Sequence, residues 1–512
     1  MPGGAAMGHS VWIGGWVNEW FKWKPSVMVQ SLLPSNDHLS AQPFINNCYS
    51  EMCMSSGAVA PMQVEKKLGW IVTAIFIVAD MVGGGVVAMP VAFKQSGLLG
   101  GIVFMVVIAT IFEYTGYQLG KVWCKMMERY PHLGVCRKPF PEMAKKTMGP
   151  GMQRFTSVMG NVTLFGIAVV YLLLSANIIH YFIGRFTSVP ASMCVVIVIL
   201  AVLILPFTYL RSPGEFWGVI VLAMVTTVVA VCSILIGIGI DFGTCYPEVG
   251  YPEQTPGSMI LSLGIFLFAF SGHYVFPTIQ HDMKNPRDFT KIVVMLYMPL
   301  SVAGYVVYGA ALESSVIYSV QTSTLQLAAN LMIAVHCIMT LVIVINPLNQ
   351  EVEHYLKVSH SFGTGRVVTR TTVLLLVLFV GLSVPDFSPV MNLVGASTIP
   401  IGCVVLPSLF YLYSEAATED EWRKGHVPTL MNVIRRTDKT VLIINFFILS
   451  VAVVGGVLGT MQGLDKIAKA EFSAPCYVRA FTHDYYNSSF TIKQNCCGRF
   501  RNISTYDDFC GA

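Results

Sequence analysis

The chain has 512 residues, of which 54% are hydrophobic and only 12% are charged, and its formal net charge is +4. A soluble domain carries about 25% charged residues, so half that share over so long a chain indicates a membrane protein. The small net charge argues against a nucleic-acid partner. The first ten residues lack the charged start of a secretory signal peptide, so none is predicted.

Residues 1–66 are polar and are expected to form a largely disordered cytosolic tail. Within this tail, Val11–Lys24 contains four tryptophans. The segment could lie in a membrane interface, or it could be an aromatic-rich tail without an anchor.

Apolar segments fill the chain from residue 68 to residue 461, and a membrane helix needs about 20 apolar residues. We count eleven, at 68–93, 98–127, 155–183, 191–210, 215–240, 257–280, 291–312, 324–346, 367–384, 389–413 and 440–461. The predicted fold class is therefore an all-α polytopic membrane protein, with a transmembrane domain over residues 67–461.

The loops between these segments differ in charge from one side of the membrane to the other. Basic clusters occur at Lys121–Arg154, Lys284–Lys291, Lys357–Arg370 and Arg423–Lys439, whereas the loops 241–256, 313–322 and 384–388 contain no Lys or Arg. Cytosolic loops are the ones enriched in basic residues, so the N-terminus is predicted to be cytosolic. An odd number of helices then places the C-terminus outside the cytosol.

The C-terminal tail, residues 462–512, agrees with that orientation. It holds two glycosylation acceptors, Asn487 and Asn502, which are predicted to be glycosylated. Outward cysteines that could form disulfides are Cys245, Cys476, Cys496, Cys497 and Cys510. Their number is odd and their pairing is not deducible from the sequence. The other cysteines are expected to be ordinary buried or cytosolic thiols.

Two of the apolar segments are interrupted. The first contains Gly83, Gly84 and Gly85, and each glycine costs about 1 kcal/mol of helix stability relative to alanine. In the sixth segment Gly272 is followed five residues later by Pro277, as Gly85 is followed by Pro90. Breaks in segments one and six indicate an inverted five-helix repeat with one extra helix, and such paired breaks mark the binding site of a transporter.

The breaks offer two kinds of backbone group at membrane depth. The N–H groups of Gly84, Gly85 and Val86, at the start of a half-helix, can bind a carboxylate. Pro90 and Pro277 lack an N–H and leave the carbonyls four residues earlier free to accept from an ammonium group or a cation. Together they suit a zwitterion, although glycine and proline are also simply commoner in membrane helices.

Several polar side chains lie near these breaks or within other segments. Asp80 could bind a cation, contact an amine, carry a proton, or merely cap a helix end. His273 could relay protons or be a satisfied polar contact. His336 and Thr340 share one helix face, and Tyr171 is a weaker candidate because tyrosines in helices usually only pack.

The stretches VGGGVVAMPVAFKQSG and FAFSGHYVFPTIQHDMKNP resemble the first and sixth helix signatures of the amino acid/auxin permease family. The likeness extends over roughly residues 64 to 461 and is closer to the animal branch of proton-coupled and vesicular inhibitory amino acid transporters. It implies a LeuT-type fold and secondary transport of amino acids, driven by protons or sometimes sodium. It also implies that Val82–Gly85 and Phe270–Gly272 line the substrate site and that Thr340 is an ion ligand. Asp80 departs from the family pattern, which leaves the coupling ion open.

Taken together, the predicted substrate-binding residues are Val82, Gly83, Gly84, Gly85, Val86, Tyr171, Phe270, Ser271, Gly272 and His273, and the predicted ion- or proton-coupling residues are Asp80, His336 and Thr340. The predicted function is secondary active transport of small neutral amino acids, coupled to protons. An amino-acid-sensing receptor with little flux and a sodium-coupled carrier remain alternatives. No enzyme, cofactor or metal site is expected, because Ser271 and His273 lack a nucleophile context and Asp80 with His273 offers too few metal ligands. The sequence leaves the oligomeric state and the choice between plasma, endosomal, lysosomal and vesicular membranes open.

Overall fold

The computed structural model describes residues 83–130, 138–186, 191–209, 217–274, 276, 293–358, 363–384, 386–469 and 475–479, and all of its regular elements there are helices. Within these residues, seven helices are long and apolar enough to cross a membrane. The fold is therefore that of an all-α polytopic membrane protein. The predicted tail at 1–66, Asp80, Val82, Pro277, Asn487, Asn502 and the cysteines beyond Cys476 lie outside the described residues.

Helix α5 (Gly84–Arg129) carries the end of the first predicted segment and the whole of the second. It starts directly after Gly83 and is interrupted at Gly97, where φ is 75°. A positive φ is strained for a residue with a Cβ, so glycine fits this joint between two helices. The predicted boundary between segments one and two is thus present, as a kink rather than a loop.

The next helices follow the predicted segments with longer ends. A short helix α6 (Pro139–Met148) precedes α7 (Pro150–Phe186), α8 (Met193–Thr208) and α9 (Trp217–Cys245), which ends in a 3₁₀ turn, η3 (Tyr246–Glu248). Nearly every position of α8 and α9 is apolar, as expected for helices that contact both lipid and protein.

Helix α10 (Pro256–Ala269) begins with a capping box between Thr255 and Ser258 and ends where the sixth segment was expected to break. Residues 270–274 are not helical. After α12 (Val293–Tyr308) come the 3₁₀ turns η5 (Gly309–Ala311) and η6 (Val316–Ser319). Helix α13 (Ser323–Tyr355) extends nine residues beyond the predicted end at 346, and α14 (Thr364–Ser383) follows.

The last spans are α15–α16 and α19. Helix α15 (Phe387–Pro400) continues through a π-helical turn, η7 (Ile401–Val405), into α16 (Leu406–Ala416). Two short helices, α17 (Glu419–Lys424) and α18 (Leu430–Arg436), lead to α19 (Lys439–Lys469). Helix α19 runs past the predicted end at 461, and α20 (Cys476–Arg479) comes after it.

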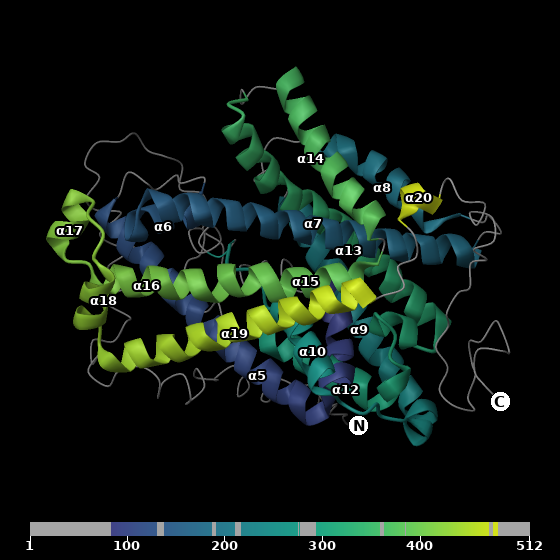
Figure 1. The fold of residues 1–512 in the computed structure, drawn as a ribbon. Coiled ribbons are helices and arrows are strands. Elements are labelled where there is room, and N and C mark those ends of the chain that lie inside the picture. The colour runs from purple at the N-terminus through teal and green to yellow at the C-terminus, as the bar shows by residue number, and fades with distance from the viewer. Residues whose placement is uncertain are drawn as a thin grey trace, which may run out of the picture.

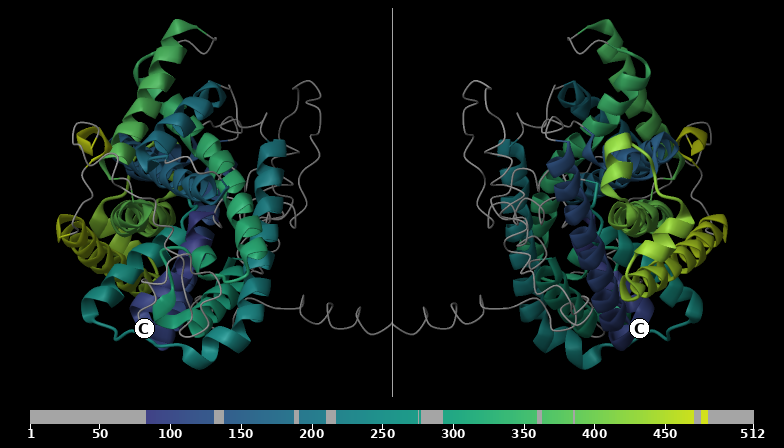
Figure 2. Two further views of the ribbon diagram at one scale, coloured as in Figure 1. Left: turned by 90° about the vertical axis from the view of Figure 1, so that its right-hand side faces the viewer. Right: turned by 90° about the vertical axis from the view of Figure 1, so that its left-hand side faces the viewer.

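The spans form a bundle with α7, α13 and the α15–α16 span inside it (Figure 1). In the α15–α16 span 72% of the apolar stretch is buried within the protein, against 22% in α19, which packs on its outer side. Helices α17 and α18 lie at one end of the bundle and α20 at the other. Figure 2 shows α15 and α19 end-on, side by side.

A disulfide corrects one expectation from the sequence. Cys194, at the start of α8, was expected to be an ordinary thiol, but it is bonded to Cys476 in α20, with 5.5 Å between their Cα atoms. The two residues are 282 positions apart, so no local pattern could have paired them. Cys245, one of the predicted outward cysteines, is also disulfide-bonded.

Candidate functional site

Helix α5 begins and helix α10 ends at the two predicted breaks, and these two helix ends are in contact. A Cβ added to Gly85, in the first turn of α5, would lie 2.7 Å from the Cα of Ala269, the last residue of α10. A neighbouring Cβ at Gly84 would lie 3.4 Å from Leu174 of α7 and 3.9 Å from Phe268 of α10. Glycine is therefore required sterically where α5 begins against α10.

Gly83 lies between two of the predicted polar side chains. A Cβ there would be 2.6 Å from the Tyr171 hydroxyl oxygen of α7 and 2.6 Å from His336 Nε2 of α13. The start of α5, where no described side chain caps the helix, thus meets a tyrosine and a histidine from two other helices. Tyr171 and His336 are 4% and 0% exposed, so both polar groups are inside the protein.

Hydrogen bonds fix the tautomer of His336. Its Nδ1 lies 3.0 Å from the carbonyl oxygen of Ala223 and 2.8 Å from Thr227 Oγ1, both in α9. A carbonyl oxygen can only accept, so Nδ1 must carry a hydrogen. The Nε2 atom of the neutral ring is then an acceptor, and Thr340 Oγ1 lies 3.2 Å from it. His336 therefore adjoins Gly83, and Thr340 lies beside it on the same face of α13.

At the end of α10, backbone carbonyl groups accept hydrogen bonds from side chains. Ser271 donates from its hydroxyl to the carbonyl of Phe268 over 2.7 Å, and the hydroxyl of Tyr297 donates to the carbonyl of Ala269 over 2.8 Å. Beyond them, the backbone N–H groups of Gly272 and His273 are directed at the sulfur of Cys403 in η7. The second break is therefore tied to the π-helical turn of the α15–α16 span.

His273 points away from Gly83. Its Nε2 lies 3.1 Å from the carbonyl oxygen of Phe112 and 3.0 Å from Thr115 Oγ1, both in the second half of α5. Its Nδ1 is buried, and no described residue provides a hydrogen-bond partner for it. The structure thus separates the two predicted histidines, and only His336 adjoins the first break.

The aromatic residues near the second break pack in different places. Phe268 faces Gly84, but Phe270 packs against Phe112 and Tyr297, with ring centroids 6.3 and 5.3 Å away. Tyr274 fills the space beside Gly402 of η7, where a Cβ would be 2.4 Å from its ring. Of these three aromatic residues, only Phe268 therefore lies against the start of α5.

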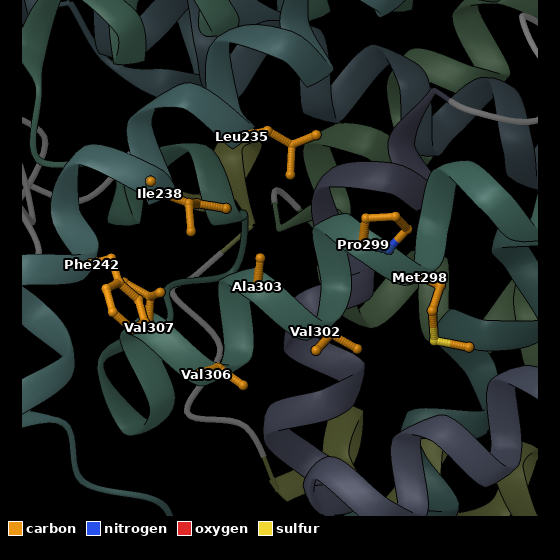
Figure 3. A pocket seen from close by; sticks show the side chains of 10 residues that line it. Leu235, Ile238, Phe242, Met298, Pro299, Val302, Ala303, Val306 and Val307 are labelled. Atoms are coloured by element: carbon orange, nitrogen blue, oxygen red, sulfur yellow. The ribbon is translucent and has the colours of Figure 1, made fainter. Parts of the chain in front are cut away.

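An apolar groove lies elsewhere in the bundle. Figure 3 shows an apolar groove of about 810 Å³ between α9 and α12, with side chains such as Phe242, Met298 and Val302 around it. None of the residues at the two breaks lines this groove. In this conformation the break region is filled by Tyr171, His336, Leu174 and Ala269, so the groove does not identify the site.

The sequence reasoning missed Thr227, Ala223, Tyr297 and Cys403. Thr227 is a polar residue within an almost wholly apolar segment, and that signal was available. The others carry no signal, because a backbone carbonyl, a tyrosine and a cysteine are all common in membrane helices. Within the described residues, no group of three or more His, Cys, Asp or Glu side chains is placed to hold a metal ion.

The start of α5 and the end of α10 meet at the two positions where breaks were predicted, and this arrangement is typical of membrane transporters. Comparison with known proteins agrees. The family model described as transmembrane amino acid transporter protein matches residues 66–461, more than half of the chain. The chain belongs to this family, and it is an integral membrane protein and not an enzyme.

Curated relatives include three proteins of Arabidopsis thaliana. Amino acid transporters AVT1D and AVT1B are each 24% identical to this chain, over 75% of it and 68% of their own length. Lysine histidine transporter-like 1 is 24% identical over 73% of this chain and 87% of its own length. The family predicted from the two motifs is confirmed, while the likeness to its animal branch stays a prediction.

Proposed function

We propose that this protein is a secondary active transporter that moves small neutral amino acids across a membrane, coupled to protons. The observation that carries the proposal is the contact of Gly85 with Ala269, which brings the two breaks together with Tyr171 and His336 at Gly83. The names of the relatives, all amino acid transporters or a lysine histidine transporter-like protein, support an amino acid as cargo.

The proposed architecture is eleven membrane helices in a LeuT-type inverted repeat with one extra helix. Splitting α5 at Gly97 and counting the shorter helices α8, α10 and α12 beside the long spans gives that number. The contacts support it, because two contacts between the halves have a counterpart of the kind that an inverted repeat requires. Helix α9 packs on α13 as the α15 span packs on α7, and α8 packs on α13 as α14 packs on α7.

The proposed orientation has the N-terminus in the cytosol and the C-terminus on the opposite side. The disulfide from Cys194 to Cys476 supports it, since both residues then lie on the non-cytosolic side, where disulfides persist. The basic residues Lys125, Arg129 and Arg436 gather near α17 and α18, at the other end of the bundle. Plasma, endosomal, lysosomal and vesicular membranes all satisfy this orientation.

The choice of a small neutral substrate rests on what surrounds the start of α5. The N–H groups of the first turn are suited to a carboxylate. None of the nearest described atoms around Gly83, Gly84 and Gly85 belongs to an Asp, Glu, Lys or Arg side chain. A charged substrate side chain would have no described partner there, and the tight glycine contacts leave room only for a small one.

Proton coupling is proposed because Asp80 is a titratable residue beside the first break in the sequence. Asp80 would take up a proton from an acidic outside and release it to the cytosol. Sodium coupling is the second candidate, because the Thr340 hydroxyl is a hard oxygen ligand beside His336.

The test is uptake of radiolabelled small neutral amino acids by the purified protein in liposomes. We expect uptake to rise when the outside is acidified and to persist when choline replaces sodium. Collapse of uptake in choline, with little effect of pH, would identify a sodium-coupled carrier. Binding of the amino acid without flux under either gradient would identify a sensing receptor.

A further inference from the structure

The hydrogen bonds around His336 donate in one direction, from Thr340 through the ring to acceptors on α9. The Thr227 hydroxyl donates to the carbonyl of Ala223 over 2.8 Å, so its oxygen is left to accept from the ring. The hydrogen on His336 Nδ1 is then shared between Thr227 Oγ1 and the Ala223 carbonyl. Both acceptors lie on α9, and Thr227 is the nearer of the two. Without it, only the 3.0 Å contact with the Ala223 carbonyl would hold the hydrogen on Nδ1, so the preference for this tautomer would be weaker.

That tautomer decides how Thr340 is oriented. Since Nε2 has a lone pair and no hydrogen, a contact of 3.2 Å with Thr340 Oγ1 requires the threonine to donate its only hydrogen to the ring. The Thr340 oxygen then presents only lone pairs to anything else that approaches it. Its hydroxyl has become an acceptor, which suits a cationic group and not an anion.

We propose that Thr227 is a positioning residue that, through His336, makes the Thr340 hydroxyl the acceptor for the ammonium group of the amino acid. The inference rests on the proposed function. The carboxylate of the substrate would bind to the first-turn N–H groups of α5. The ammonium group is only a few bonds from the carboxylate, so it would lie near the same turn. His336 Nε2 adjoins Gly83 at the start of that turn, and Thr340 is one helical turn from His336.

A matched control stands next to Thr227 in the chain. Thr226 donates to the same carbonyl of Ala223 over the same 2.8 Å and is equally buried, but it makes no described contact with His336. Thr227→Val removes the hydroxyl at nearly constant volume, and Thr226→Val makes the same change beside it. Thr227→Ser restores a hydroxyl without the methyl group.

The experiment measures alanine uptake in liposomes by these variants, with N,N,N-trimethylalanine as a competitor that keeps the charge but has no N–H to donate. We expect Thr227→Val to raise the KM for alanine roughly tenfold, as for loss of one hydrogen bond to a charged group, with Vmax retained. It should also bind alanine and the trimethyl competitor about equally, whereas the wild type prefers alanine. Thr227→Ser and Thr226→Val should resemble the wild type.

Equal effects of Thr227→Val and Thr226→Val would overturn the proposal, because both would then act through packing. A changed KM for sodium, with an unchanged preference for alanine over the trimethyl competitor, would overturn the proposal as well. The cation bound at Thr340 would then be the sodium ion and not the ammonium group. Failure of the wild-type protein to transport any amino acid would contradict the proposed function instead.

The positioning step has a readout that needs no transport. In protein labelled with ¹⁵N-histidine, the signal of His336, assigned by its loss in His336→Gln, reports which ring nitrogen carries the hydrogen. We expect the Nδ1–H form in the wild type and a mixture in Thr227→Val. An Nε2–H form in the wild type, or no change in Thr227→Val, would contradict the proposed positioning.

Discussion

Gly85 of α5 and Ala269 of α10 are in backbone contact, and a Cβ on Gly85 would overlap both the Cα and the Cβ of Ala269, at 2.7 and 2.8 Å. These residues are 184 positions apart and lie where α5 begins and α10 ends. Their contact brings the two predicted breaks together into one candidate site.

Gly85→Ala should abolish uptake, because the added methyl group cannot fit without separating α5 from α10. Gly84→Val should abolish it too, by obstructing the approach of a carboxylate to the first-turn N–H groups. Gly151→Ala in α7 is the control, since a Cβ there meets no atom within 4 Å. The measurement is alanine uptake normalised to surface expression. Normal uptake by Gly84→Val would remove the substrate from this break.

Asn487 and Asn502 should be glycosylated and Asn161 should not, because Asn161 lies within the membrane-spanning part of α7. Glycosidase treatment should therefore change the gel mobility of the wild type and leave Asn487→Gln/Asn502→Gln unchanged. A mobility shift that survives in the double variant would contradict the proposed orientation of the tail.

Asp80→Asn should flatten the dependence of uptake on external pH while retaining exchange of amino acid across the membrane. The neutral side chain can still bind substrate in either orientation but can no longer carry a proton. The check is uptake by the variant over a series of external pH values, with counterflow as the measure of exchange. A pH dependence identical to that of the wild type would show that Asp80 is not the coupling group.

Arg370→Met should destabilise the protein strongly. Arg370 is 0% exposed and donates to Glu353 over 2.6 Å and to the carbonyl of Thr208 over 2.6 Å. Removing one partner of a buried ion pair costs about 3–5 kcal/mol. Arg366 also contacts Glu353, at 3.4 Å, so the lower end of that range is expected. Thermal unfolding in detergent measures it, with Arg423→Met, from the exposed pair with Asp420, as the near-neutral control.

Glu419→Gln should lower stability slightly, and only above acidic pH. The hydrogen bond from Arg129 holds the pKa of the Glu419 carboxyl below its usual value of 4.5. A lowered folded-state pKa means that the stabilisation is present above pH 4.5 and is lost as the pH falls through the folded-state pKa. Because Glu419 is largely exposed, the pair contributes at most about 1 kcal/mol. Melting temperatures at pH 7 and at acidic pH should differ between wild type and variant only at pH 7.

The sequence by itself determined the membrane class, the approximate positions of the apolar segments, and the places where α5 begins and α10 ends. These features depend on composition and on glycine and proline, whose effects on a helix are local. For the same reason the family could be named from two short motifs. The segment ends were less well predicted, as the extensions of α13 and α19 show, because polar helix ends outside the bilayer carry no hydropathy signal.

Only the tertiary structure decided which side chains meet. His273 is one residue from the second break, yet packing turns it towards Phe112 and Thr115, while His336, far along the chain, adjoins Gly83. The disulfide between Cys194 and Cys476 and the contact of Thr227 with His336 could not be predicted from the sequence either. The rotation of a helix about its axis depends on how its side chains fit those of its neighbours, and in a chain whose membrane helices are apolar on nearly every face, the sequence pattern leaves that rotation open.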